Sequence, residues 1–169
     1  MRRSAGDPIL QALLALGLLF LASTGPVDAQ LRIGGHAVHA GSTFGGSSGF
    51  GLRAGAGLPL VPLDVAASGE YFFPDCAPAA KGCGLWGYGV DGNVRMVLPF
   101  VRPYVSGGLI YRRVDPGGGA ETQTRSGFAL GVGLGLSIRA IGAFVEGRYE
   151  FVRPERQAVW RAGVMLGFL

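Results

Sequence analysis

Charged side chains recur at every second position in several segments of this sequence. The clearest example is Glu146, Arg148 and Glu150, which alternate with apolar residues and glycine. In an extended chain, residues two apart share one face, so these three groups would point the same way. Guanidinium and carboxylate groups form charge-assisted hydrogen bonds with one another. The spacing therefore predicts mutual pairing of arginine and carboxylate groups along one face of a strand.

A second kind of chemistry would need a nucleophile beside a general base. His36, Ser106 and Ser137 are the candidates, but no His-x-Ser or other tight pairing occurs in the sequence. His36 and His39 differ in parity, so on a strand they would point to opposite faces. We therefore predict that the protein is not an enzyme and that His36 is a hydrogen-bonded filler of the charged face.

Segment 87–92 (GYGVDG) matches the phosphate-binding pattern G-x-G-x-x-G literally. It lies inside a predicted strand, and no helix follows it. The helix N-terminus that would hold a phosphate is therefore missing, and the segment predicts no cofactor.

The most regular alternation lies in segment 128–139 (FALGVGLGLSIR). Large apolar side chains from Phe128 to Ile138 occupy one face, and small residues ending in Arg139 occupy the other. This period of two predicts a strand rather than a helix. The small face suits a crowded interior, and the large face suits surroundings as apolar as itself.

The same alternation predicts seven further strands. The eight predicted strands cover residues 30–40, 50–58, 63–73, 85–98, 101–113, 128–139, 143–152 and 158–169. Their lengths are roughly those that cross a bilayer at a tilt. Polar loops alternate with tight turns between them, which is the pattern of an antiparallel up-and-down barrel.

Charged side chains gather on one face of these strands. They are Arg32, Arg53, Asp64, Glu70, Asp91, Arg95, Arg102, Arg112, Arg139, Glu146, Arg148, Glu150 and Arg161. In a soluble barrel this face would be outside, and the glycines beside the charges would have no evident purpose. Facing inward, the glycines leave room for guanidinium groups that pair with carboxylates. We therefore predict an all-β, eight-stranded antiparallel transmembrane β-barrel with a charged lumen.

Aromatic residues on the opposite face concentrate at the strand ends next to the polar loops. They are Phe50, Tyr71, Phe73, Trp86, Tyr88, Tyr111, Phe128, Tyr149, Phe151 and Trp160. Such rings favour the boundary between membrane and water. We predict that they form an aromatic girdle on the loop side.

Residues 1–29 form a predicted secretory signal peptide, and residues 30–169 the barrel domain. Arg2 and Arg3 precede the apolar segment 9–22, and small residues with Pro26 follow it. The apolar run of about 14 residues is shorter than the roughly 20 that a spanning helix needs. This favours cleavage over a retained anchor.

Cys76 and Cys83 lie in the predicted loop 74–84. Exported proteins meet an oxidising compartment, so we expect these two cysteines to form a disulfide that stiffens the loop. Two free thiols or a metal site are the alternatives. No histidine lies near the cysteines in the sequence, so no metal is predicted.

The net charge of +4 is spread through the chain. Because the sequence has no basic block, we predict no nucleic-acid partner.

The strand number, the alternation and the aromatic placement resemble the bacterial outer-membrane eight-stranded β-barrel family, which includes the OmpA-type transmembrane domain. The resemblance covers residues 31–169. It implies a location in the bacterial outer membrane, surrounded by outer-membrane lipid, and insertion by the barrel-assembly machinery. Family members often end in an aromatic residue that this machinery reads; here Phe168 precedes Leu169.

An eight-stranded interior is just wide enough for its own side chains, and thirteen charged groups should plug it. We therefore predict a structural or surface-interaction protein that binds an extracellular ligand through its polar loops. A narrow channel for small solutes or ions is the alternative, because the lumenal glycines leave space for water. A lipid-modifying enzyme, a class that the family includes, is a weaker alternative.

Overall fold

The computed structural model describes residues 30–41, 47–58, 61–74, 83–96, 98, 101–119, 121–138 and 140–168. They form eight β-strands: β1 (Gln30–Ala40), β2 (Ser48–Gly57), β3 (Leu63–Phe73), β4 (Gly84–Arg95), β5 (Val101–Asp115), β6 (Gln123–Ile138), β7 (Ile141–Val152) and β8 (Glu155–Phe168). Among these residues, no helix is long and apolar enough to cross a membrane. The predicted signal peptide lies outside the described residues.

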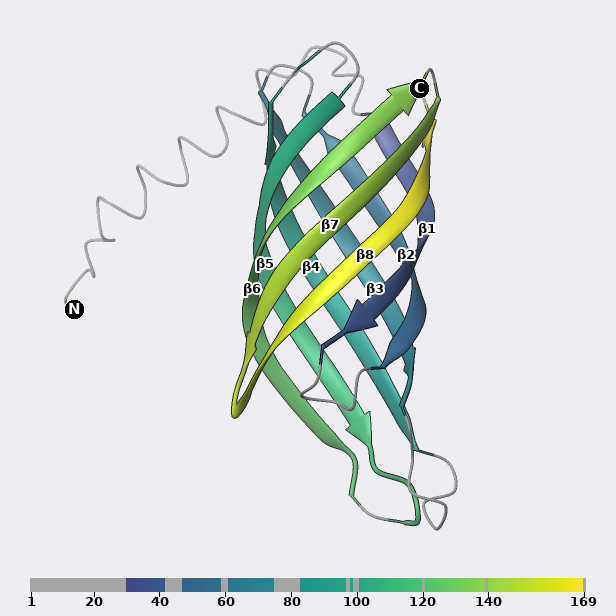
Figure 1. Ribbon diagram of the computed structural model, residues 1–169, viewed down its shortest axis with the longest axis vertical. Helices are drawn as coiled ribbons and strands as arrows, with labels where there is room; N and C mark the ends of the chain where they lie inside the picture. Colours follow the sequence, from purple (N-terminus) through teal and green to yellow (C-terminus); the bar gives the residue numbers. More distant parts are fainter. Residues whose placement is uncertain are drawn as a thin grey trace, which may run out of the picture.

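The strands close into a single barrel (Figure 1). Each strand pairs antiparallel with the next one along the chain, and β1 pairs with β8 to complete the ring. The closing ladder runs from the pair Leu31 and Phe168 to the pair Ala40 and Val159. The predicted eight-stranded antiparallel up-and-down barrel is therefore confirmed. Closure leaves no unpaired sheet edge.

The two ends of the barrel differ. We call the end with the β1–β2, β3–β4, β5–β6 and β7–β8 links the loop end, and the other the turn end. At the loop end, β5 and β6 reach beyond β1 and β2 (Figure 1). They are also the longest strands, with 15 and 16 residues.

Several predicted strand boundaries were wrong. The expected loop 114–125 is shorter, because β5 continues to Asp115 and β6 already begins at Gln123. The expected loop 153–157 is a two-residue turn, since Val152 pairs with Glu155. β4 ends at Arg95 instead of residue 98. In the two loop-end hairpins, polar residues resemble a loop in sequence, but backbone hydrogen bonds to the neighbouring strand extend the ladder.

The two faces of the sheet have opposite chemistry. Large apolar side chains point outward and are exposed all around the barrel; Leu52 is 69% exposed and Val132 is 65% exposed. Charged and polar side chains point inward, and Arg112, Glu146 and Glu150 have no exposed surface. A water-soluble protein has the reverse arrangement.

Candidate functional site: the barrel lumen

Glycines of one strand face charged residues of the next. On β7, Glu146 and Arg148 lie directly opposite Gly133 and Gly131 of β6. A methyl group at Gly131 would lie 2.9 Å from Arg148 Cβ and 2.6 Å from Ser106 Oγ. The small face of β6 therefore provides the space that the charged side chains of β7 occupy.

Arg112 and the carboxylates around it form the most buried part of the lumen. Its Nη1 donates to Glu70 Oε2 at 2.9 Å, and its Nη2 donates to both carboxylate oxygens of Glu150, at 2.7 Å for Oε2. Gln157 also donates to Glu150 Oε2 at 2.8 Å. One guanidinium thus joins β3 to β7 from its place on β5.

Arg161 and Arg148 extend these contacts across the lumen. Arg161 Nε lies 2.6 Å from Glu70 Oε1, and its Nη1 donates to Glu146 Oε1 at 3.2 Å. Arg148 donates to both oxygens of Asp91 at 3.1 Å. Each arginine therefore connects side chains from strands that are not neighbours in the sheet.

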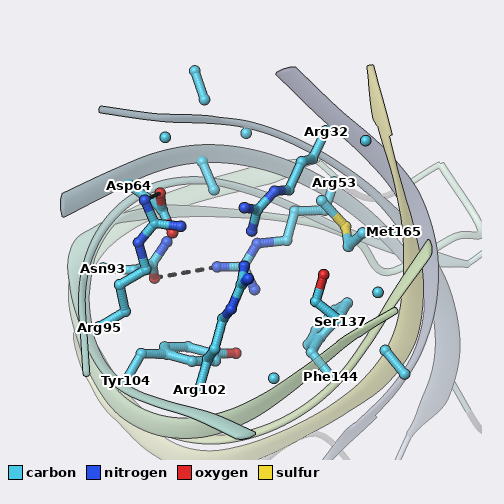
Figure 2. A pocket seen from close by; sticks show the side chains of 18 of the residues that line it. Arg32, Arg53, Asp64, Asn93, Arg95, Arg102, Tyr104, Ser137, Phe144 and Met165 are labelled. Carbon is cyan, nitrogen blue, oxygen red and sulfur yellow. Dashed lines mark hydrogen bonds and ion pairs between the residues drawn. The ribbon is translucent and has the colours of Figure 1, made fainter. Parts of the chain in front are cut away.

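Arg53 forms the side of this cluster nearest the turn end. Its guanidinium donates to Glu146 Oε2 at 3.0 Å and to Asn93 Oδ1 at 3.2 Å. The hydroxyl of Tyr104 donates to the same Glu146 oxygen at 2.9 Å. Figure 2 shows the Arg53–Asn93 contact as a dashed line.

Arg148 also forms ion pairs with Glu146 at 3.7 Å and with Glu150 at 3.5 Å. The central network is the name we give to the eight charged residues joined by all these contacts: Arg53, Glu70, Asp91, Arg112, Glu146, Arg148, Glu150 and Arg161. It holds four arginines and four carboxylates, so its formal charges balance. Buried charges are tolerated only when they are paired and hydrogen-bonded in this way.

A buried apolar cluster, which we call the apolar cap, lies in the lumen on the loop side of the central network. Val38, Ala40, Phe72, Leu85 and Val159 form a buried cluster on the lumenal face, none more than 2% exposed. Arg112 of the central network lies 4.7 Å from the ring centre of Phe72, a cation–π geometry. The sequence did not predict this cluster, because its members come from four strands.

The turn end of the lumen is hollow. A cavity of about 500 Å³ lies there, which we call the turn-end cavity. Arg32, Asp64, Arg95 and Arg102 point into it (Figure 2). Arg95 Nη2 and Asp64 Oδ1 form an ion pair of 3.2 Å.

The lumen thus brings together twelve of the thirteen predicted charged residues, in two places. Eight form the central network and four line the turn-end cavity. The thirteenth, Arg139, lies outside the residues whose structure is described.

The predicted girdle residues lie on the outer face in separate contact groups. Phe50, Tyr71, Phe73 and Trp86 form one group on β2, β3 and β4, with ring centres 4.7 to 6.1 Å apart. Phe128, Tyr149 and Phe151 form another on β6 and β7, where the rings of Phe128 and Phe151 stack at 4.5 Å. Tyr88 and Tyr111 are cross-strand partners, and Trp160 is exposed on β8.

Both histidines have a side-chain partner, and His36 lies on the charged face as a hydrogen-bonded filler, as the sequence predicted. His36 Nε2 lies 3.2 Å from Glu70 Oε1, beside the central network. His39 Nδ1 lies 3.0 Å from Ser48 Oγ on the exposed side of β1 and β2. This pair spans a hairpin, so only the register of β1 and β2 reveals it. Among the described residues, no ion pair involves His39 and no group of three potential metal ligands occurs.

The predicted disulfide has one member in the described part of the chain. Cys83 is not a free thiol, whereas Cys76 lies outside the described residues. The Cys76–Cys83 disulfide therefore stays a prediction.

Comparison with known proteins identifies similar structures and no similar sequence families. No protein-family model and no curated protein matches this sequence. The N-terminal β-barrel domain of Pseudomonas aeruginosa OprF superposes with a TM-score of 0.64 at 16% identity, covering 83% of this chain and 100% of that one. Neisserial surface protein A superposes with a TM-score of 0.62 at 23% identity, covering 82% and 96%.

Ail, the attachment invasion locus protein of Yersinia pestis, is also similar. Its crystal structure in complex with the heparin analogue sucrose octasulfate has a TM-score of 0.60 at 15% identity, covering 83% of this chain and 97% of that one. At these identities the likeness concerns the fold. The chain therefore has the fold of the eight-stranded β-barrels of the bacterial outer membrane.

Proposed function

We propose that the protein resides in the bacterial outer membrane as a plugged barrel and acts as a structural or surface-interaction protein. The exposed apolar face supports this location, because such a surface needs lipid and not water around it. The similar fold of OprF, Neisserial surface protein A and Ail supports it as well.

The central network is the observation that best supports the proposal of a plugged barrel. Its ion pairs join β2, β3, β4, β5, β7 and β8 across the lumen. A solute moving along the axis would have to separate buried charges that have no water to replace their partners. The apolar cap adds a second barrier, of apolar side chains, on the loop side. Both barriers argue against the alternative function of a narrow channel.

Planar-bilayer recording of the refolded protein tests this proposal. We expect no steady conductance steps, because two barriers in series block the lumen. A variant with Phe72→Ser and Arg112→Ser is the positive control, since it shortens one large side chain in each barrier. Steady open steps from the unmodified protein would establish the narrow channel instead.

The loop end is the part of the barrel that we assign to contact with an extracellular ligand. β5 and β6 carry their hairpin beyond the neighbouring strands (Figure 1). The hairpin is locally ordered, since Gly117 N–H donates to Asp115 Oδ1 at 3.0 Å and Arg125 Nη2 donates to Gln123 Oε1 at 2.9 Å. An ordered polar projection from a closed barrel suits recognition better than transport.

A further inference from the structure

The hairpin of β5 and β6 is covered along one of its long edges and open along the other. β5 pairs with β4 up to its last residue, Asp115. The ladder between β6 and β7 starts at Gly127 and Val152, whereas β6 itself already begins at Gln123. Figure 1 shows the β7–β8 hairpin ending short of the β5–β6 hairpin. Among the described residues, segment 123–126 therefore extends beyond the closed ring with a neighbouring strand on the β5 side only.

Thr124 and Ser126 direct their main-chain groups to this open side. Successive residues of an antiparallel strand direct their N–H and C=O groups alternately to the two neighbouring strands. Met96 N–H donates to the carbonyl of Pro103 at 2.8 Å, so the outward-facing residues of β5 bond to β4 and its inward-facing residues bond to β6. In β6 the outward-facing Thr124 and Ser126 therefore carry the groups that β7 would bind. In the described part of the chain, no backbone hydrogen bond outside the strand ladders involves either residue.

The covered side holds this edge in strand conformation. Thr124 and Ser126 lie opposite Arg113 and Tyr111 of β5 in an unbroken ladder. Between those two residues of β5 lies Arg112, whose guanidinium is fixed by the carboxylates of the central network. A rigid edge loses less conformational entropy on binding than a flexible loop does. The edge is therefore a preformed template for one more strand.

We propose that the edge formed by Thr124 and Ser126 binds an extended segment of another protein, which adds to β6 as a further strand. The two residues present N–H and C=O groups about 7 Å apart, the spacing of every second residue in a strand. A β-strand offers matching groups at this spacing, whereas a glycan or a lipid headgroup does not. Both side chains are exposed, and neither is a lysine or proline, which commonly protect an edge. The inference names a class of partner for the proposed surface-interaction function, on which its role in the cell rests.

Surface plasmon resonance of the full barrel in phosphatidylcholine nanodiscs tests the edge. The probe is reduced and alkylated ribonuclease A, an unfolded polypeptide, and we expect saturable binding of this probe but not of native ribonuclease A. Thr124→Pro should weaken the binding at least about tenfold, because proline removes the N–H that faces the partner and leaves the hydrogen bonds to β5 in place. Thr124→Val keeps that N–H and should bind as the unmodified barrel does. Absence of binding to the unfolded probe, or equal binding by the two variants, would overturn the proposal.

A second pair of variants covers the edge without changing its residues. The turn at residues 153–154 is replaced by a hairpin of about ten residues, threonine and valine around an Asn-Gly turn, so that β7 can pair with β6 as far as Gln123. The control carries a Gly-Ser segment of equal length, which forms no strand. We expect the hairpin to slow amide exchange at Thr124 and Ser126 and to abolish binding of the unfolded probe, whereas the Gly-Ser segment preserves binding. Binding that survives behind the paired hairpin, or that both insertions abolish, would contradict the assignment.

Adhesion of bacteria that display the protein separates failure of this inference from failure of the proposed function. If the bacteria adhere to immobilised proteins and Thr124→Pro leaves adhesion unchanged, the edge assignment is wrong and the proposed function stands. If the unmodified protein mediates no adhesion but the unfolded probe still binds and Thr124→Pro weakens it, the edge assignment stands and the proposed function is wrong. Dimerisation of the purified barrel that Thr124→Pro abolishes would assign the edge to a second copy of this chain and overturn the proposed partner.

Discussion

At the scale of single residues, the packing of the lumen depends on glycines, which have no side chain, as well as on the charged residues beside them. Arg112 has no exposed surface and touches Glu70 and Glu150. A methyl group at Gly87, its partner residue on β4, would clash with the Arg112 guanidinium. Buried ion pairs contribute little net stability compared with apolar packing. We therefore interpret this contact as a means of closing the lumen rather than of strengthening the fold.

Two glycines on the same face of β6 test this view at the residue scale. Gly131→Ala should destabilise the barrel by about 1–3 kcal/mol, because its methyl group would press on Ser106, Arg148 and the carbonyl of Gly147. Gly135→Ala should stay within about 0.5 kcal/mol, because the nearest atom lies 3.6 Å from its methyl group. Urea unfolding in lipid vesicles measures both. Equal losses of unfolding free energy in the two variants would show that these positions need glycine for its backbone conformation and not for the space that it leaves.

At the scale of the strand, β6 shows the difference between the outer and inner faces of the barrel most clearly. Its outward residues are large and exposed, and its inward residues leave space for the charges of β7. This strand has no charged side chain between Arg125 and Ile138. Its outer face is therefore the part of the wall best suited to contact acyl chains.

The depth of β6 in the membrane can be tested with arginine. Val132→Arg or Leu134→Arg should each cost about 2–4 kcal/mol of folding free energy in lipid, because both residues lie near the middle of the strand. Ile138→Arg, at the turn end of the same face, is the matched control and should cost about 0–1 kcal/mol. Urea titration of barrels in phospholipid vesicles gives these values. A similar cost at all three positions would contradict the proposed depth.

At the scale of the whole molecule, the lumen has three parts in series. An apolar cap lies at the loop end, a charge-balanced network fills the middle, and an arginine-lined cavity lies at the turn end. The lumen is therefore lined by apolar side chains near the loop end and by arginines at the turn end. Surface recognition is assigned to the loop end.

Shortening the loop-end links tests whether surface recognition depends on the loop end. Replacing residues 42–46, 75–82 and 116–122 by short Gly-Asn turns should leave the unfolding free energy of the barrel nearly unchanged, since the ladders between the strands remain. Adhesion of bacteria that display the protein to a panel of immobilised matrix proteins and glycans should be lost. Adhesion that survives in the shortened variant would place the binding surface elsewhere.

The sequence by itself determined the fold class, because a period of two leaves each strand with one apolar and one charged face. Segment 128–139 predicted which face points outward, and the described part of β6 has that orientation. The ends of β5, β6 and β8 were less predictable, since polar residues at a strand end look like a loop until their ladder partners are known.

Only the tertiary structure decided which lumenal charges meet. Arg112 lies 42 residues from Glu70 in sequence, and Arg53 lies 93 residues from Glu146. Parity shows that such side chains share an interior, but their height along the axis depends on the stagger between strands, which no single strand encodes. That stagger separates a balanced central network from an arginine-lined cavity, so the composition of the inner face alone could not show that the middle of the lumen is filled and its turn end is hollow.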